Sequence, residues 1–186
     1  MGEMPLQEIQ EKLFSMSAMK SSEELPSNIT LTAAPDEQVL RDVQDLQAKR
    51  LIVWDFDLKS QRWTTPVSNP EHMIKCVAYY GDGVLGYYCV GYAIGCITAD
   101  GKAVEVDFIE KRCDASDDLR SKFLPIIVDA FALYGLYLNK QGVTSVEKFI
   151  LVNPVPDKVG YYKKHGFELV DDYLNGCSAM VKHLIK

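Results

Sequence analysis

Three β-forming segments joined by short turns constrain the fold of this chain more than any other feature. Residues 74–80 and 84–98 are rich in β-formers, and the Gly-Asp-Gly between them supplies the positive φ that a tight hairpin turn requires. Ala-Asp-Gly at 99–101 then turns the chain into a third segment, residues 102–111. Consecutive strands with tight connections pair side by side, so we predict an antiparallel meander over residues 74–111. Three glycines of the second segment are expected to mark bulges or close backbone approaches: Gly86, Gly91 and Gly95.

The hydrophobic period changes after the meander. Residues 125–140 are strongly apolar, with proline at the first helical position and Gly142 just beyond the end, which predicts a long buried helix. Further elements are predicted as strands over 28–33, 51–56 and 149–152, helices from 35 and over 157–165, and a closing hairpin over 167–174 and 177–185. The expected class is α/β in the mixed α+β sense. Helices should flank a central, mixed, largely antiparallel sheet of six to seven strands.

The first 27 residues are predicted to form a helix over 5–19 and a polar linker over 20–27, ahead of a folded domain over 28–186. Two interpretations of this helix stay open. It packs on the domain, or it is a methionine-rich helix that docks on a partner or on a second copy of the chain, as in a homodimer.

Composition excludes several classes of function. The net charge of -6 argues against a nucleic-acid binder, which needs a basic surface, and mildly favours cationic partners such as amines. The cysteines and histidines are scattered, so we expect free thiols in a reducing compartment and no metal site. No basic targeting segment and no apolar run long enough to span a bilayer is apparent, which predicts a cytoplasmic protein without a membrane partner.

The segment 159–167, VGYYKKHGF, carries the clearest motif. It resembles the aromatic-Lys-Lys…Gly-Phe helix of GNAT-superfamily N-acetyltransferases, with local likeness to the protein-lysine acetyltransferase branch. The resemblance covers about residues 74–185 and makes 28–186 the expected acetyltransferase domain. It implies acetyl-CoA as co-substrate, an amine acceptor and Tyr162 as the general acid that protonates the departing thiolate. The alternative is that Tyr162 only packs against the sheet.

A second motif lies in the strand Val-Glu-Val-Asp-Phe-Ile at 104–109. It resembles the family strand whose glutamate is the general base, which gives that role to Glu105, with Asp107 as the reserve candidate. Regular alternation predicts Glu105, Asp107 and Ile109 on one face of the strand, opposite Val104, Val106 and Phe108. The alternative is a strand with one charged, solvated face. A base is needed because an alkyl amine titrates near ~10 and attacks a thioester only when neutral.

The pyrophosphate-binding loop departs from the family pattern. Its equivalent here is residues 120–125, where Phe123 and Pro125 replace the usual small residues. The resemblance also implies that a backbone N–H near Ile109, where the fourth and fifth strands part, stabilises the oxyanion. The residues that the resemblance assigns to the cofactor are Phe108, Ile109, Glu110, Arg120, Ser121, Lys122, Phe123, Leu124, Pro125, Asn153 and Tyr162.

These motifs predict direct acetyl transfer from acetyl-CoA to a primary amine, either protein lysine or a small polyamine, in a ternary complex. The altered loop keeps two alternatives open: a degenerate GNAT domain that only binds or regulates, and an enzyme with another acyl donor. A covalent route through Cys96 or Cys113 is possible in principle, but neither cysteine has a base near it in the sequence or a precedent in the family. The acceptor pocket is expected over residues 51–72, where four side chains form an aromatic, acidic pocket or are simply core aromatics and surface acids: Trp54, Asp55, Asp57 and Trp63.

Overall fold

A seven-stranded sheet organises the protein, which we describe from a computed structural model over residues 5–62 and 67–184. The strands run in the order β1-β2-β3-β4-β5-β7-β6, and every neighbouring pair is antiparallel except the parallel pair β4–β5. The bounds are β1 Asn28–Thr32, β2 Met73–Asp82, β3 Gly86–Ile97, β4 Ala103–Lys111, β5 Lys148–Val152, β6 Glu168–Leu174 and β7 Cys177–His183. The predicted mixed, largely antiparallel sheet and its meander are confirmed.

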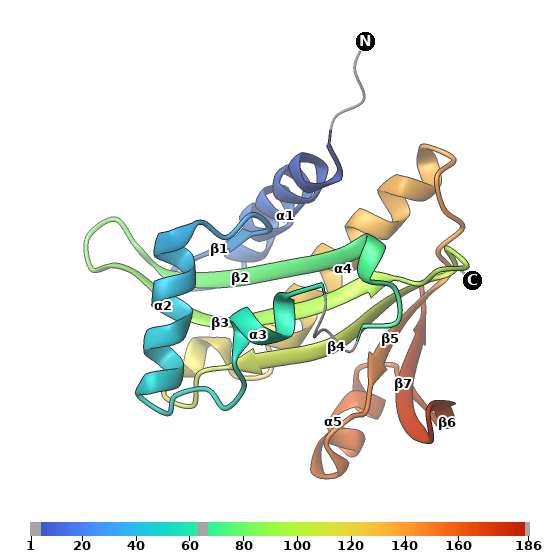
Figure 1. The fold of residues 1–186 in the computed structure, drawn as a ribbon. Coiled ribbons are helices and arrows are strands. Elements are labelled where there is room, and N and C mark those ends of the chain that lie inside the picture. The colour runs from blue at the N-terminus through green and yellow to red at the C-terminus, as the bar shows by residue number, and fades with distance from the viewer. Residues whose placement is uncertain (1–4, 63–66, 185–186) are drawn as a thin grey trace.

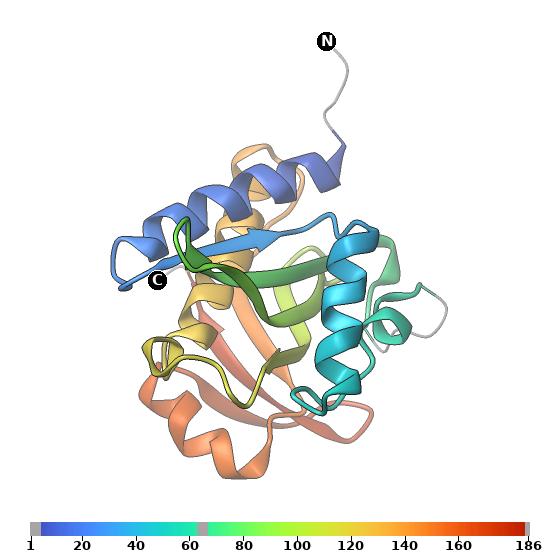
Figure 2. The same cartoon turned by 90° about the vertical axis from the view of Figure 1, so that its left-hand side faces the viewer.

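Helices cover both faces of this sheet (Figure 1). The α-helices are α1 Leu6–Ser22, α2 Glu37–Ala48, α3 Phe56–Ser60, α4 Phe123–Lys140 and α5 Val159–Lys164, with short 3-10 turns at η1 Pro70–His72, η2 Asp117–Leu119 and η3 Pro156–Lys158. One core lies between the sheet and α1 with α4, and a second lies between the sheet and α2 with α3. Figure 2 shows α1 lying along β1 at one edge of the sheet.

The N-terminal helix α1 is part of the main core. Leu13, Phe14 and Ala18 are buried in it, and the rings of Phe14 and Phe131 of α4 stack at 5.4 Å. The carboxylate of Glu11 accepts a hydrogen bond of 2.5 Å from the backbone N–H of Ala33, just after β1. The interpretation in which the helix packs on the domain is therefore confirmed.

Helix α4 is long and apolar enough to cross a membrane by length and composition alone, with a mean hydropathy of 1.2 over Phe123–Lys140, which corrects the expectation that no apolar run is long enough. However, 61% of this stretch is buried inside the protein, where the helix contacts the sheet and α1. The apolar composition is that of a core helix packed on both sides.

Three local predictions differ from the structure. The first hairpin turns after Asp82, whose carboxylate accepts hydrogen bonds from the N–H groups of Val84 and Leu85, so the predicted turn at 81–83 is early by about two residues. Helix α4 begins at Phe123, ahead of Pro125. The predicted strand over 51–56 is wrong: Asp55 caps α3 by accepting from the N–H of Leu58 at 3.0 Å.

Two irregularities in β4 prepare a site. Ile94 of β3 pairs with Phe108 but the next residue, Gly95, pairs with Val106, so Asp107 forms a β-bulge. The pairing of β4 with β5 ends at Val106 and Leu151, although β4 continues alongside β3 to Lys111. Figure 1 shows β5, β7 and β6 turning away from β2–β4 beyond this point. Asp107 is thus the first residue past the place where the two parallel strands part.

Candidate active site

Glu105 is a charged side chain in the interior of the protein. It is 0% exposed, and both carboxylate oxygens accept hydrogen bonds. One oxygen, Oε1, accepts from the backbone N–H of Ser68 at 3.2 Å and from the thiol of Cys96 at 3.7 Å. The other, Oε2, accepts from the hydroxyl of Tyr173 at 2.9 Å. The alternative of a solvated face at this position is wrong, because the carboxylate is held by protein donors in place of water.

Asp107 lies beside Glu105 and is less completely buried. An oxygen of its carboxyl group lies within 4.8 Å of an oxygen of Glu105, while its Oδ2 is buried with no partner among the described residues. Burial, and after it the charge of Glu105, raises the pKa of Asp107 to about 8. Two carboxyl groups this close disfavour double ionisation, so the pair holds one proton near neutral pH.

The bulge also reverses the predicted facing of the residues that follow. Ile109 packs with Val104 and Val106 against the α1–α4 core, whereas Phe108 packs against the α2–α3 core. The extra residue at Asp107 shifts the alternation by one position. The expectation that Phe108 shares a face with Val106 is therefore wrong, and the Phe108 ring lies on the α2–α3 side of the sheet.

An aromatic cluster surrounds Phe108 on that side. The Trp54 ring meets it edge-on at 4.8 Å, and the Lys59 ammonium lies over it at 5.2 Å from the centroid. Asp55 is used as the cap of α3 and Asp57 lies in the first turn of that helix, so these acids have local structural roles. Trp63 lies outside the described residues.

A groove of about 320 Å³ lies beside the end of β4, between the loop that follows it and α5. Lys111, Arg120 and Lys158 line it, together with Ser121, which has a φ of 60° and lies two residues before Phe123, the first residue of α4. The Tyr161 hydroxyl donates to the Ser121 carbonyl at 3.2 Å and joins α5 to this loop. Asp117, which pairs with Arg120 at 3.1 Å, lines the groove as well, so three cationic side chains face one acid. The excess of positive charge suits a polyanion, and no side chain of the described residues caps the first turn of α4.

The other residues of the predicted loop lie apart from this groove. Phe123 and Leu124 are 5% and 8% exposed and belong to the core. Lys122 and Pro125 line a different groove, between α1 and α4, where the Lys122 ammonium lies 3.9 Å from Glu24. Arg120 and Ser121 are the loop residues that face the groove beside β4.

The remaining predicted site residues, Tyr162, Asn153 and Glu110, lie in different parts of the fold. Tyr162 is half-buried on α5 and packs edge-on against Phe167 at 6.3 Å, and burial raises the pKa of its phenol. Asn153, with a φ of 49°, follows β5 and donates its N–H to the Ser178 carbonyl at 2.9 Å. The Glu110 carboxylate accepts from the N–H groups of Val53 and Trp54 at 2.5 and 3.2 Å, so this side chain holds the segment before α3.

Cys96, Glu105 and Asp107 also offer donor atoms within 4.8 Å of one another, a spacing that a metal ion could bridge. The absence of a metal stays a prediction. It agrees with the hydrogen bonds of Glu105, whose carboxylate already accepts from a thiol, a tyrosine hydroxyl and a backbone N–H. Burial raises the pKa of the Cys96 thiol to about 12, so it is present as a neutral donor.

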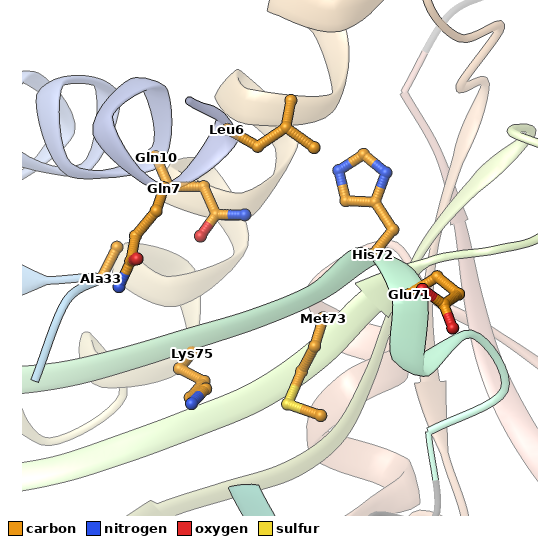
Figure 3. Close-up of a pocket in the computed structure, with 8 residues that line it drawn as sticks. All are labelled: Leu6, Gln7, Gln10, Ala33, Glu71, His72, Met73 and Lys75. Carbon is orange, nitrogen blue, oxygen red and sulfur yellow. The ribbon is translucent and has the colours of Figure 1, made fainter. Parts of the chain in front are cut away.

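A separate cavity of about 240 Å³ opens between α1 and η1 (Figure 3). Gln7 and Gln10 line it from α1, and His72 lines it from η1. The His72 Nε2 lies 2.6 Å from the hydroxyl of buried Tyr134. None of the residues that line this cavity belongs to the carboxyl pair, so it is distinct from the site on β4.

Comparisons with known proteins agree on the fold. N-acetylglutamate synthase from Neisseria gonorrhoeae, solved with coenzyme A and N-acetyl-glutamate, matches with a TM-score of 0.50 and 10% identity over 85% of this chain and 35% of that chain. Tetrahymena GCN5 matches with a TM-score of 0.51 and 13% identity over 86% of this chain and 96% of that chain. RimL, a ribosomal alpha-N-protein acetyltransferase solved with coenzyme A, matches with a TM-score of 0.51 and 13% identity over 83% of this chain and 93% of that chain. The chain thus spans about a third of the synthase. No protein-family model and no curated protein matches the sequence. At these identities the likeness shows the fold, which is the GNAT fold.

Proposed function

We propose that this chain, with its GNAT fold, is an acetyl-CoA-dependent N-acetyltransferase that moves an acetyl group to a primary amine in a ternary complex. One observation carries the proposal: a buried carboxyl pair, Glu105 and Asp107, lies on β4 where β4 and β5 part. A pair of carboxyl groups with perturbed protonation in the interior of a sheet costs stability, and such groups concentrate at functional sites.

The carboxyl pair has the chemistry of a general base. Attack on a thioester requires the neutral amine, so the ammonium form must first lose a proton. Once the pair has released its shared proton, it accepts a proton from the ammonium at Asp107, whose Oδ2 has no other described partner. The amine nitrogen then bonds to the thioester carbonyl carbon and loses a second proton to solvent, and the carbon–sulfur bond breaks to release the coenzyme A thiolate. A raised carboxyl pKa favours this step, because it narrows the gap to an amine that titrates near ~10.

The groove beside β4 supports the binding of acetyl-CoA. Its three cationic side chains, on Lys111, Arg120 and Lys158, suit the diphosphate of the co-substrate, and Ser121 takes the positive φ that glycine supplies in other phosphate-binding loops. The missing glycines are thus offset in part by a serine in the left-handed region. We propose that the diphosphate of the co-substrate binds in this groove and does not contact Phe123 and Leu124, which are buried.

Tyr162 is proposed as the general acid that protonates the departing thiolate. Its phenol is half-buried and keeps its proton at neutral pH, since burial raises its pKa. A thiol titrates near ~8.5 and an ordinary phenol near ~10, so the transfer from the phenol to the thiolate runs uphill, and the raised pKa of Tyr162 adds to its cost. For the acceptor we propose a protein lysine or a small polyamine, because the chain carries a net charge of -6 and Phe108 already accommodates one ammonium, that of Lys59.

Titration calorimetry with acetyl-CoA tests whether the co-substrate binds. Mass spectrometry on a mixed amine and peptide panel tests whether the acetyl group is transferred. We expect binding that weakens as salt rises, followed by a gain of one acetyl group on an amine. Absence of heat at millimolar acetyl-CoA, together with no transfer, would refute the proposal.

The second candidate is a non-catalytic GNAT domain that binds or regulates. The specific observation in its favour is the loop before α4, which holds Phe123 and Leu124 in the core and so leaves fewer small residues at the groove. Binding of acetyl-CoA without any transfer across the panel would favour this candidate over the enzyme. Transfer from a longer acyl thioester, with acetyl-CoA inactive, would instead indicate another acyl donor.

A further inference from the structure

Tyr173 reaches the carboxyl pair from a part of the chain that no motif connects with it. It belongs to β6, at the far edge of the sheet, yet its hydroxyl donates to Glu105 Oε2 at 2.9 Å. Its ring is half-buried and packs on a small cluster of Ala103, Ile150 and Ala179. The ring is thus anchored independently of the hydroxyl, which fixes the direction of the hydrogen bond.

A backbone irregularity in β6 makes this contact possible. Val170 pairs with Ala179 and Leu174 pairs with Cys177, so residues 171–173 of β6 lie opposite Ser178 alone. Within this bulge Asp172 has a φ of 55°, in the left-handed region that L-residues seldom adopt. A bulge redirects side chains next to it. In this case it accompanies the turn of Tyr173 toward the interior, while Asp171 and Asp172 stay exposed.

The donors around the pair are distributed unequally. Glu105 accepts from Ser68, Cys96 and Tyr173, whereas the Oδ2 of the neighbouring Asp107 accepts from none of the described residues. Hydrogen bonds from donors stabilise the ionised form of a carboxyl group. The single proton of the pair therefore belongs on Asp107 and the negative charge belongs on Glu105.

We propose that Tyr173 is a positioning residue that keeps the charge of the pair on Glu105 and the shared proton on Asp107. Among the described residues, the groups that face Glu105 are Cys96 from β3, Asp107 from β4, Tyr173 from β6 and the Ser68 N–H from the segment before η1. Cys96 and Tyr173 both stay neutral, because burial raises the pKa of each. Asp107 is then the group that exchanges a proton with the acceptor, and the charge on Glu105 sets the pH at which Asp107 loses its proton.

Tyr173→Phe tests this role, since phenylalanine keeps the ring packing and removes only the hydroxyl. Infrared spectra of the protein without acetyl-CoA follow the C=O stretch of the protonated carboxyl group as pH rises, and Asp107→Asn identifies the band. We expect the band to persist to a pH about one unit higher in Tyr173→Phe, because the singly protonated pair can then move its proton onto Glu105, whereas the doubly ionised pair has no such relief. Tyr79→Phe is the matched control: it removes a tyrosine bond of 2.5 Å to the Asp42 carboxylate, on the α2 side of β2.

The kinetic consequence rests on the proposed function. The rising limb of kcat/KM should move to higher pH by the same amount in Tyr173→Phe, with most of the rate regained at the alkaline plateau. A band and a pH profile that both match wild type would overturn the inference even if transfer is normal. A shifted band in a protein that neither binds acetyl-CoA nor transfers acetyl would support the inference and count against the proposed function.

Discussion

Replacing Asp107 by asparagine should change how the stability of the protein depends on pH. The folded carboxyl group has its pKa raised to about 8, first by burial and then by Glu105, whereas an aspartate in an unfolded chain titrates near ~3.9. Between these values the folded state holds a proton that the unfolded state has released. The free energy of unfolding therefore falls as pH rises through that window. One group costs at most ~1.4 kcal/mol per pH unit, so the loss between about pH 5 and pH 8 is at most ~4 kcal/mol.

Asparagine has nearly the shape of aspartate, cannot ionise and can donate an amide N–H to Glu105. We therefore expect Asp107→Asn to be more stable than wild type at about pH 8.5 and to lose that advantage near pH 5, where the wild-type carboxyl group is neutral. Urea unfolding followed by circular dichroism at both pH values measures the difference. Asp171→Asn, exposed on β6, is the control and should follow wild type. Parallel pH curves for wild type and Asp107→Asn would refute the argument that the pair holds a proton.

The remaining predictions concern turnover, binding and the close contact of β3 with β4. Glu105→Gln should lower turnover at pH 7 by ~10²–10⁴-fold with partial recovery at high pH; a pH-independent loss in steady-state assays would contradict a role in proton transfer. Tyr162→Phe should lower turnover more than acetyl-CoA affinity, measured by kinetics beside calorimetry, and unchanged turnover would remove the tyrosine from the mechanism. Lys158→Ala should weaken acetyl-CoA binding and flatten its salt dependence in calorimetry. Gly95→Ala should destabilise by ~1–3 kcal/mol in urea, because its Cβ would overlap the Glu105 carbonyl, whereas Gly83→Ala, with open space around it, should be nearly neutral.

The order of elements was predictable because it depends on local signals. Hydrophobic period, turn residues and the Gly166 terminator indicate the meander, α4, α5 and the last hairpin, and each of these forms where it was expected to within a few residues. The strand predicted over residues 51–56 does not form, because backbone N–H groups of this segment donate to a side chain that is distant in the sequence. The Glu110 side chain accepts from the N–H groups of Val53 and Trp54, and a carboxylate in that role replaces a neighbouring strand.

The chemistry of the site was predictable only in part, for a related reason. The resemblance singles out Glu105 and Asp107, but strand alternation cannot reveal that Asp107 is an extra residue, and nothing near Tyr173 in the sequence points toward Glu105. Gly95 is the one local signal, since only a glycine permits β3 to approach the Glu105 carbonyl so closely.

Two separate irregularities of the sheet meet at the carboxyl pair. The bulge at Asp107 in β4 places its carboxyl group beside Glu105, and the bulge at 171–173 in β6 accompanies the contact of Tyr173 with the same group. Each interrupts a ladder of hydrogen bonds, and the pair adds the cost of a charge in the interior. A regular sheet with apolar residues at these positions would make the folded state more stable. Strain of this kind persists where it contributes to function, and its coincidence at Glu105 and Asp107 is the strongest structural argument that β4 carries the reactive groups of the protein.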